Sequence, residues 1–331
     1  MPHSEVLKGM ATGQSTLQGI GTLDRRGEPS ALGRWRHNIV RFLRTKPLGS
    51  IGAAIVLAIL LMAVFAPQVA PFGFDHRALR EKLQDPSAKH LLGTDIQGRD
   101  VLSRIIYGAR VSAFVGFGAV LISTVIAGVI GLVSGYFGGT VDTIVQRFID
   151  VWIAFPALIL LLAVLSVFGT PTGKLHLGFA TLDSSQQRAA QVIIVLGLIF
   201  SAGSSRVIRG AALSVRNNLY VEGARTVGAG HLRILWHHIL PNVLPTIIVI
   251  ASLQLGAAIL AEAALSFLGF GIPDPVPSWG LMLSGLATAR IRTDPLLTLW
   301  PGLAITFAVF GFNMLGDALR DVLDPRLRGS R

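Results

Sequence analysis

Six stretches of this chain contain no Asp, Glu, Lys, Arg or His, and this pattern limits the possible folds more than any other feature. The stretches cover residues 47–74, 111–141, 151–173, 189–205, 239–261 and 295–316. About 20 mostly apolar residues are enough for a helix to cross the hydrocarbon core of a bilayer. Five stretches exceed that length, and the fourth, 189–205, is at the lower end of the range of about 17–25 residues for a spanning helix. We therefore predict an all-α polytopic membrane protein with six transmembrane helices.

The composition agrees with a membrane location. Hydrophobic residues make up 51% of the chain, charged residues make up 14%, and the mean hydropathy is +0.61. Soluble domains carry about 25% charged residues, so a soluble globule with this composition would expose too much apolar surface. The chain has no cysteine. A disulfide, a zinc–thiolate site, an iron–sulfur cluster and a thiol nucleophile are therefore excluded within it.

The distribution of positive charge orients the predicted helices. With the N-terminus in the cytoplasm, 18 of the 29 Lys and Arg residues lie in four inner segments, which are 1–50, 136–150, 205–238 and 317–331. Seven of the other 11 lie in one outer loop, 70–110. Because Lys and Arg concentrate in cytoplasmic loops, we expect both termini in the cytoplasm. This bias accounts for the net charge of +11, so we predict no nucleic-acid partner.

The N-terminal region divides by composition. Residues 1–29 are polar and rich in Gly, Ser and Thr, which predicts a disordered cytoplasmic tail. From residue 30 to 46, Trp35, Ile39 and Phe42 fall on one helical face among basic residues. This pattern predicts an amphipathic helix in contact with lipid of the inner leaflet. Residues 30–99 would then hold this helix, the first span and the extracytoplasmic loop.

The second predicted span is rich in glycine. Gly131, Gly135 and Gly139 are spaced by four residues, and small residues at this spacing let helix backbones approach closely within a membrane. The spacing is compatible with a subunit interface or a translocation path. We favour ordinary tight helix packing, because the motif is common.

The sequence contains no recognisable enzyme site. The patterns His-Glu-x-x-His, Gly-x-x-x-x-Gly-Lys-[Ser/Thr] and Gly-x-Ser-x-Gly do not occur in it. We predict no catalytic residues and no metal site, and we interpret His231, His237 and His238 as basic surface residues. Glu262, at the outer edge of the fifth span, is interpreted as a hydrogen-bonded structural carboxylate.

The inner segment 205–242, between the fourth and fifth spans, is unusually long. Its sequence predicts two helical pieces, 206–227 and 231–240. Gly228 and Gly230 indicate a turn between them, because glycine adopts positive φ readily. Pro241 is expected to end the second piece, since proline lacks an N–H and clashes with a continuing helix. A compact helix–turn–helix between two spans would transmit a push to both of them.

Residues 222–241, EGARTVGAGHLRILWHHILP, closely resemble the Glu-Ala-Ala loop of ABC importer permeases. In that pattern Glu-Ala-Ala is followed by three residues, Gly, nine residues and Ile-x-Leu-Pro. The matching residues here are Glu222, Ala224, Gly228, Leu240 and Pro241. Gly replaces the second alanine at position 223, and His replaces Ile at position 238; both replacements are similar to variants of the peptide-transport subgroup.

Three further segments resemble that subgroup. They are HLLGTDIQGRDVLSRIIYGAR at 90–110, EAALSFLGFGIPDPVPSWG at 262–280 and LGDALRDVLDPRLR at 315–328. The resemblance implies the type I ABC importer permease fold and a multi-pass protein of the bacterial inner membrane. It implies a core transmembrane domain at 100–318, with the coupling loop at 205–242 and a cytoplasmic tail at 319–331.

The resemblance also implies a set of partners. They are a second homologous permease subunit, two cytoplasmic ATP-binding subunits and an extracytoplasmic solute-binding protein. ATP and Mg would be bound by the partner subunits, so no cofactor is expected in this chain. The coupling loop, with Glu222, Gly223, Ala224, Arg225, Gly228, Leu240 and Pro241, would dock into an ATP-binding subunit. There Gly228 permits the turn, Ala224 permits close approach, and Glu222 offers a carboxylate to donors on the loop or the partner.

Two other classes of function remain open at this point. A secondary transporter or channel is expected to show intramembrane charges, broken helices or inverted repeats. A membrane enzyme or scaffold is expected to show a polar catalytic set at one membrane depth. Among ABC importers the substrate could be a dipeptide, an oligopeptide, a nickel complex, an opine or a short sugar, and no substrate-binding residue is identified.

Overall fold

The computed structural model of the protein describes residues 46–176, 181–284 and 295–323. Residues Pro47–Arg331 form one compact unit. The predicted tail 1–29 and all but the last residue of the predicted amphipathic helix 30–46 lie outside the described residues. So does most of the predicted cytoplasmic tail, because the description ends at residue 323.

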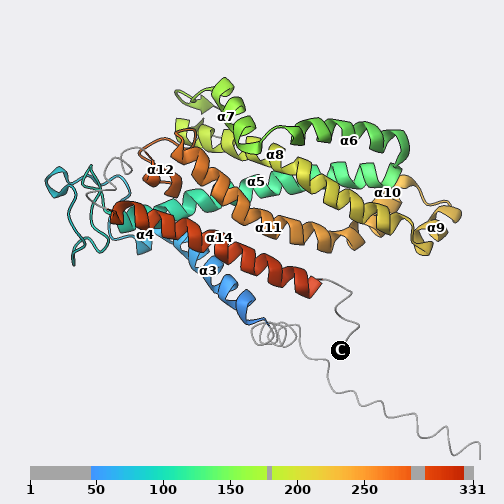
Figure 1. Ribbon diagram of the computed structural model, residues 1–331, viewed down its shortest axis with the longest axis horizontal. Helices are drawn as coiled ribbons and strands as arrows, with labels where there is room; N and C mark the ends of the chain where they lie inside the picture. Colours follow the sequence, from blue (N-terminus) through green and yellow to red (C-terminus); the bar gives the residue numbers. More distant parts are fainter. Residues whose placement is uncertain (1–45, 177–180, 285–294, 324–331) are drawn as a thin grey trace, which may run out of the picture. The chain divides into compact units, whose positions relative to one another are not determined.

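Almost all of the described chain is helical, and Figure 1 shows long helices running side by side. The helices are α3 (Pro47–Val64), α4 (Ala66–Val69), η1 (Leu79–Glu81), α5 (Val101–Phe137), α6 (Gly139–Ala154), α7 (Ala157–Phe168), α8 (Ser184–Arg216), α9 (Leu219–Thr226), α10 (His231–Ile234), η2 (Leu235–Ile239), α11 (Leu240–Phe267), α12 (Trp279–Leu283) and α14 (Leu296–Leu323). Two short strands, β1 (Leu175–His176) and β2 (Thr181–Leu182), pair antiparallel with Leu175 opposite Leu182.

Within the described residues, five helical segments are long and apolar enough to cross a membrane: α3, α5, α8, α10 through α11, and α14. The pair α6 and α7 makes a sixth candidate, bent by 87°. The prediction of an all-α membrane protein is confirmed, but the third predicted helix, 151–173, is divided at Phe155 and Pro156. Phe155 is extended, with ψ 135°, because the ring of a following proline disfavours helical backbone.

Close approach of α5 and α8 depends on glycine. A Cβ added at Gly131 would lie 2.7 Å from the carbonyl oxygen of Ser205, and one at Gly135 would lie 2.7 Å from the Cβ of Ala212. Both distances are too short for any side chain, so these glycines let the two backbones touch. Gly139, in contrast, begins α6 and has nothing within 4 Å of its added Cβ. The tight-packing interpretation is therefore confirmed for Gly131 and Gly135.

Four apolar clusters hold the described helices together, and the smallest of them contains Val101, Ile105 and Leu297. One joins α5, α7 and α8 around Val115, Leu161 and Leu196. A second joins α3, α5, α11 and α14, so the first span packs within the same unit as the other helices. The third gathers where α9 and α10 meet α8 and α11, with Ile208 and Ile234 among its members. In Figure 1, α9 and α10 lie at one end of the long helices and the segment between α4 and α5 lies at the other.

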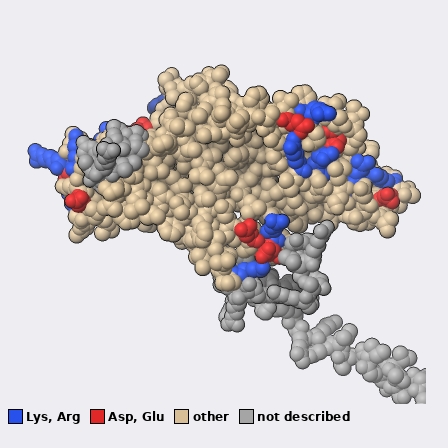
Figure 2. All heavy atoms as spheres, in the orientation of Figure 1, with Lys and Arg blue, Asp and Glu red and all other residues tan. Residues whose placement is uncertain are grey.

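Charged side chains avoid the middle of the long helices. Figure 2 shows a broad uncharged belt on the visible face, with Lys, Arg, Asp and Glu gathered away from it. The two aspartates of α6 are paired with α8: Asp142 pairs with Arg209, and Asp150 pairs with Arg206. Phe148 of the same helix is 75% exposed. Charges that are paired, together with exposed apolar side chains, suit a helix surrounded by lipid rather than water.

Candidate coupling site

The predicted turn between two helices is present. Helix α9 ends at Thr226, and Gly228 follows with φ +86°. The N–H of Gly228 donates to the carbonyl of Arg225 (2.9 Å), and the N–H of Ala229 donates to that of Ala224 (3.0 Å). These two bonds form a Schellman motif, which needs a residue with positive φ at the position of Gly228. The prediction that Gly228 shapes this turn is confirmed.

Buried apolar residues fix α9 and α10 against the ends of the long helices. Val221, Ile234 and Ile239 are fully buried, and they share a cluster with residues of α5, α8 and α11. Ala224 packs against this cluster, so its small side chain permits close approach within the chain itself. The α9–α10 segment is therefore a rigid extension of the bundle.

Other side chains of the segment are exposed, and four of them are large and apolar. Leu219, Val227, Leu232 and Trp236 are between 64% and 89% exposed. Glu222 is exposed as well, and among the described residues no hydrogen bond or ion pair of its side chain is found. Exposed apolar side chains grouped around one turn are typical of a protein–protein interface. Sequence analysis missed these four side chains, because apolar residues at helical spacing do not show which face the fold will bury.

Aromatic and basic side chains attach the turn to the end of α5. The hydroxyl of Tyr136 lies 2.7 Å from Nδ1 of His231, and its ring lies 5.3 Å from the Cζ of Arg225. The ring of Phe137 lies 5.6 Å from that of His231. Tyr136 is only 3% exposed. The predicted site residue Arg225 thus stacks within the chain, and Tyr136 and His231 join the site although the motif did not include them.

The prediction that Pro241 ends the second helical piece is wrong. Residues Leu235–Ile239 form a π-helical turn, in which the N–H of Leu240 donates to the carbonyl of Leu235, and α11 then continues to Phe267. Pro241 stands in the first turn of α11, where a missing N–H is tolerated. Leu240 is half-buried against the third cluster, and Gly223 has nothing within 4 Å of its added Cβ.

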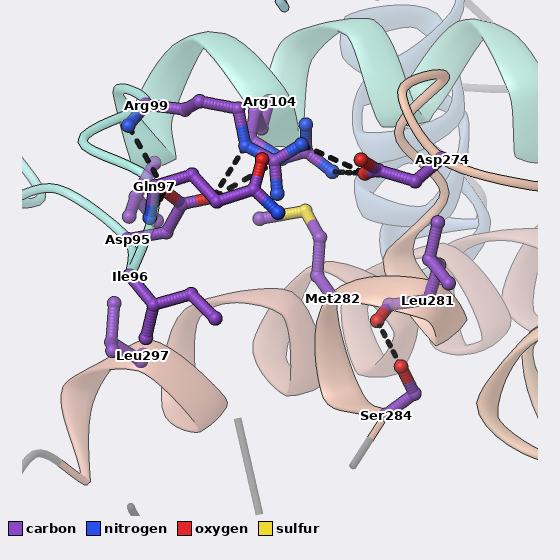
Figure 3. Close-up of a pocket in the computed structure, with 11 residues that line it drawn as sticks. Asp95, Ile96, Gln97, Arg99, Arg104, Asp274, Leu281, Met282, Ser284 and Leu297 are labelled. Atoms are coloured by element: carbon purple, nitrogen blue, oxygen red, sulfur yellow. Dashed lines mark hydrogen bonds and ion pairs between the residues drawn. The ribbon is translucent and has the colours of Figure 1, made fainter. Parts of the chain in front are cut away.

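A second charged group lies at the opposite end of the bundle, beside a cavity of about 190 Å³ (Figure 3). Arg99 donates to Asp95 and to Asp274, each at 2.7 Å, and Arg104 lies 3.5 Å from Asp274. Burial opposes the charge of Arg99, but its bonds to Asp274 and Asp95 raise the pKa of the guanidinium above its usual value. These ion pairs join the motif segments 90–110 and 262–280, which are far apart in sequence.

A buried histidine completes this end. Nδ1 of His90 lies 2.9 Å from Asp100, which accepts from the N–H of Ser103 (2.8 Å) and so caps α5. Nε2 of His90 lies 3.1 Å from Glu81. Hydrogen bonds from Lys89 and from His90 lower the pKa of the Glu81 carboxyl. Because the serine contacts the aspartate rather than the histidine, this group is a helix cap and not a catalytic triad.

Glu262 is a structural carboxylate, as predicted. Its side chain is 1% exposed and accepts hydrogen bonds from Ser112 of α5 (3.0 Å) and Ser266 of α11 (2.7 Å). A buried polar group is stable only when it is hydrogen-bonded. Glu262 therefore ties two spans together rather than reacting with a ligand.

The chain is similar to known proteins over most of its length. Residues 127–329 match the family described as binding-protein-dependent transport system inner membrane component, and residues 33–86 match the N-terminal TM domain of oligopeptide transport permease C. The chain is 38% identical to the dipeptide transport system permease protein DppC of Alkalihalophilus pseudofirmus, over 90% of this chain and 92% of that protein. It is 36% identical to the glutathione transport system permease protein GsiD of Pectobacterium atrosepticum, over 89% and 92%. It is 35% identical to the oligopeptide transport system permease protein OppC of Bacillus subtilis, over 90% and 92%.

Proposed function

Because this chain belongs to the family of binding-protein-dependent transport system inner membrane components, we propose that it is one of two permease subunits of an ATP-driven peptide importer. In this proposal α9, the turn and α10 couple the bundle to an ATP-binding subunit. The observation that carries it is the geometry of this segment. Its buried side chains fix it to α5, α8 and α11, and its exposed side chains present Leu219, Val227, Leu232 and Trp236 to a partner.

The proposed mechanism is mechanical. A partner that closes around the turn pushes α9 and α10, and these helices are joined in sequence to α8 on one side and to α11 on the other. The buried residues Val221, Ile234 and Ile239 keep the segment packed against the bundle when the partner pushes on it. The push therefore moves the spans and alternates the access of the path between the two sides of the membrane.

The energy source belongs to the partners in this proposal. The chain lacks the phosphate-binding pattern Gly-x-x-x-x-Gly-Lys-[Ser/Thr], so we propose that ATP and Mg bind to two cytoplasmic ATP-binding subunits. An extracytoplasmic solute-binding protein and a second permease complete the complex. The α9–α10 end then faces the cytoplasm, together with both termini, and the Arg99–Asp274 end faces outward.

We propose short peptides as the substrate class. The support comes from the relatives, whose names refer to dipeptides, oligopeptides and glutathione. A secondary transporter without an ATPase partner is the alternative, and the break between α6 and α7 is one of the features expected of that class. The exposed apolar face of α9–α10 favours the importer, since a carrier that works alone has no use for such a surface on its coupling segment.

The test starts from the whole complex. The chain, tagged at its C-terminus, is extracted from native membranes in mild detergent, and the proteins that co-purify are identified. We expect a second permease and ATP-binding subunits with the unaltered chain and with Gly223→Ala. With Gly228→Asp, which adds bulk and charge at the turn, the ATP-binding subunits should be lost and peptide uptake abolished, while the chain stays in the membrane. Recovery of the chain alone, with uptake intact in liposomes without ATPase, would establish the secondary carrier instead.

A further inference from the structure

A hollow of about 600 Å³ lies beside the bend between α6 and α7. Its walls come from the residues at the bend and from facing stretches of α8 and α11. The larger lining side chains are Trp152, Phe155, Phe200 and Leu253. None of the described residues that line it carries an ionisable group. A hollow of this size is in the range of small-molecule sites in proteins, which are mostly apolar with a few placed polar groups.

The polar groups of the hollow lie near the middle of the spans. The side-chain amide of Gln254, on α11, donates to Ser204 and to the carbonyl of Phe200 (3.3 Å), both on α8. Ser123 of α5 donates to the amide oxygen of Gln254 (3.2 Å). Such a network holds three helices together. Gln254 and Ser204 also line the hollow, which helix packing alone does not require.

The bend supplies further polar groups on the facing wall. The last carbonyls of α6 have no continuing helix to pair with, because the chain leaves helical geometry at Phe155 and Pro156 has no N–H. Trp152, Ile153 and Phe155 line the hollow. Irregular backbone at membrane depth is tolerated where it is buried in protein or borders a water-filled cavity. Broken helices of this kind are found at the substrate sites of transporters.

We propose that this hollow is the wall that the subunit contributes to the translocation path, and that Gln254, Ser204 and the terminal carbonyls of α6 bind the backbone of a peptide in transit. This inference rests on the proposed function. A peptide brings free N–H and C=O groups. Carbonyls at the bend accept from peptide N–H groups. On the other wall both N–H groups of Gln254 are already used, so the Ser204 hydroxyl is the donor for a peptide carbonyl, and the remaining lone pair of the Gln254 amide oxygen is an acceptor for a peptide N–H. A helix of a partner permease has its own backbone groups paired internally, and a lipid tail has none. The uncharged apolar lining accepts varied side chains, so the wall recognises what all peptides share.

The position of the hollow connects it to the coupling site. Ser204 lies on α8, which ends at Arg216 just before α9, and Gln254 lies on α11, which continues from α10. The wall that carries Gln254 and Ser204 is therefore formed by the two helices that the coupling segment joins. A displacement of that segment changes the distance between them.

Because the chain has no cysteine, single cysteines test this proposal in an otherwise unaltered subunit. We suggest Gln254→Cys and Ser204→Cys, with Leu260→Cys as the control. Leu260 is on α11 and 53% exposed, but it does not line the hollow. The complete importer is reconstituted in sealed vesicles of known orientation, and a charged, membrane-impermeant thiol reagent is added to one side at a time.

We expect both hollow cysteines to react from the cytoplasmic side in the resting complex. When vanadate traps the ATP-binding subunits, that reaction should slow at least tenfold and reaction from the opposite side should appear. Leu260→Cys should react with a lipophilic maleimide and not with the charged reagent. The proposal is overturned if Gln254→Cys and Ser204→Cys behave like the control, or if they react with neither reagent because a partner helix covers them.

A functional measurement separates this inference from the proposed function. ATP-dependent peptide uptake by the complex with the unaltered chain tests the importer itself. If uptake is present while the hollow cysteines fail to react, only the assignment of the wall is wrong. If uptake and the ATP-binding subunits are both absent, the proposed function fails first.

Discussion

Replacing Gly228 with alanine tests whether the turn between α9 and α10 must keep its shape. Nothing lies within 4 Å of a Cβ added at Gly228, so alanine meets no steric obstacle there. The cost is therefore in the backbone alone, because φ is +86°. Left-handed backbone costs a residue with a Cβ about 1–2 kcal/mol, which lowers the equilibrium constant for forming the turn by a factor of about 5–30.

Gly223→Ala is the matched control, five residues earlier in the same segment. Gly223 also has nothing within 4 Å of its added Cβ, but it lies inside α9 with ordinary helical backbone. Alanine there stabilises the helix by about 1 kcal/mol. The same side chain is thus added at two exposed glycines with opposite expected effects on the segment.

The assay is ATP-dependent peptide uptake by vesicles that contain the whole transporter, with the amount of each variant in the membrane measured in parallel. We expect Gly228→Ala to lower uptake at least fivefold, and Gly223→Ala to leave it unchanged or improve it. Uptake by Gly228→Ala within twofold of the unaltered chain would refute the argument that the turn geometry is needed for coupling. Equal losses in both variants would show that space on this face, and not backbone shape, is what matters.

Three further outcomes are expected. Gly135→Val forces α5 away from the backbone of α8, which should destabilise the purified complex by about 1–3 kcal/mol. The measurement is its melting temperature, which should fall. Tyr136→Phe removes only the hydroxyl bonded to His231, and it should raise the ATP consumed per peptide transported while the complex still assembles. The lowered pKa of Glu81 means that its bond to Lys89 stabilises the fold above the ordinary carboxyl pKa of 4.5 and is lost as pH falls through the lowered value. Glu81→Gln should therefore weaken the dependence of stability on acid, measured by thermal unfolding between neutral and acidic pH.

The sequence was sufficient to predict the spans, but not their interruptions. Charge-free stretches mark the membrane segments because a charge in the bilayer is costly wherever it falls. The effect of proline, in contrast, depends on its neighbours. Pro156 breaks the third span, whereas Pro245 and Pro301 lie inside continuous helices and Pro241 follows a π-helical turn. Neighbouring helices and local π geometry can satisfy the freed carbonyls in a membrane bundle, and a single sequence does not show where they will.

The candidate coupling site was predicted only in part, again because a single sequence does not show which residues the fold brings together. The motif located Glu222, Gly228 and the turn between α9 and α10. It did not show that Arg225 would stack on Tyr136, which lies 89 positions away in the chain. Such contacts arise from the packing of α5 against α8, and only the folded bundle brings them together.

The two ends of the coupling segment are attached differently to α8 and α11. This difference indicates how a displacement of the segment would be shared between these two helices. Helix α10 passes into α11 through the π-helical turn without a gap, whereas α9 is separated from α8 by Asn217 and Asn218. A continuous helix transmits displacement along its axis, while a short non-helical joint can absorb part of it by changing φ and ψ. We therefore expect α11 to follow the segment more closely than α8 does.

The contact that must change is then the one between α8 and α11 at the hollow, where Gln254 of α11 donates to Ser204 of α8. A short bifunctional methanethiosulfonate that links Gln254→Cys to Ser204→Cys through two disulfides should stop ATP-dependent uptake, and a reductant, which cleaves the link, should restore it; uptake that continues with the link in place would show that the two helices move as one.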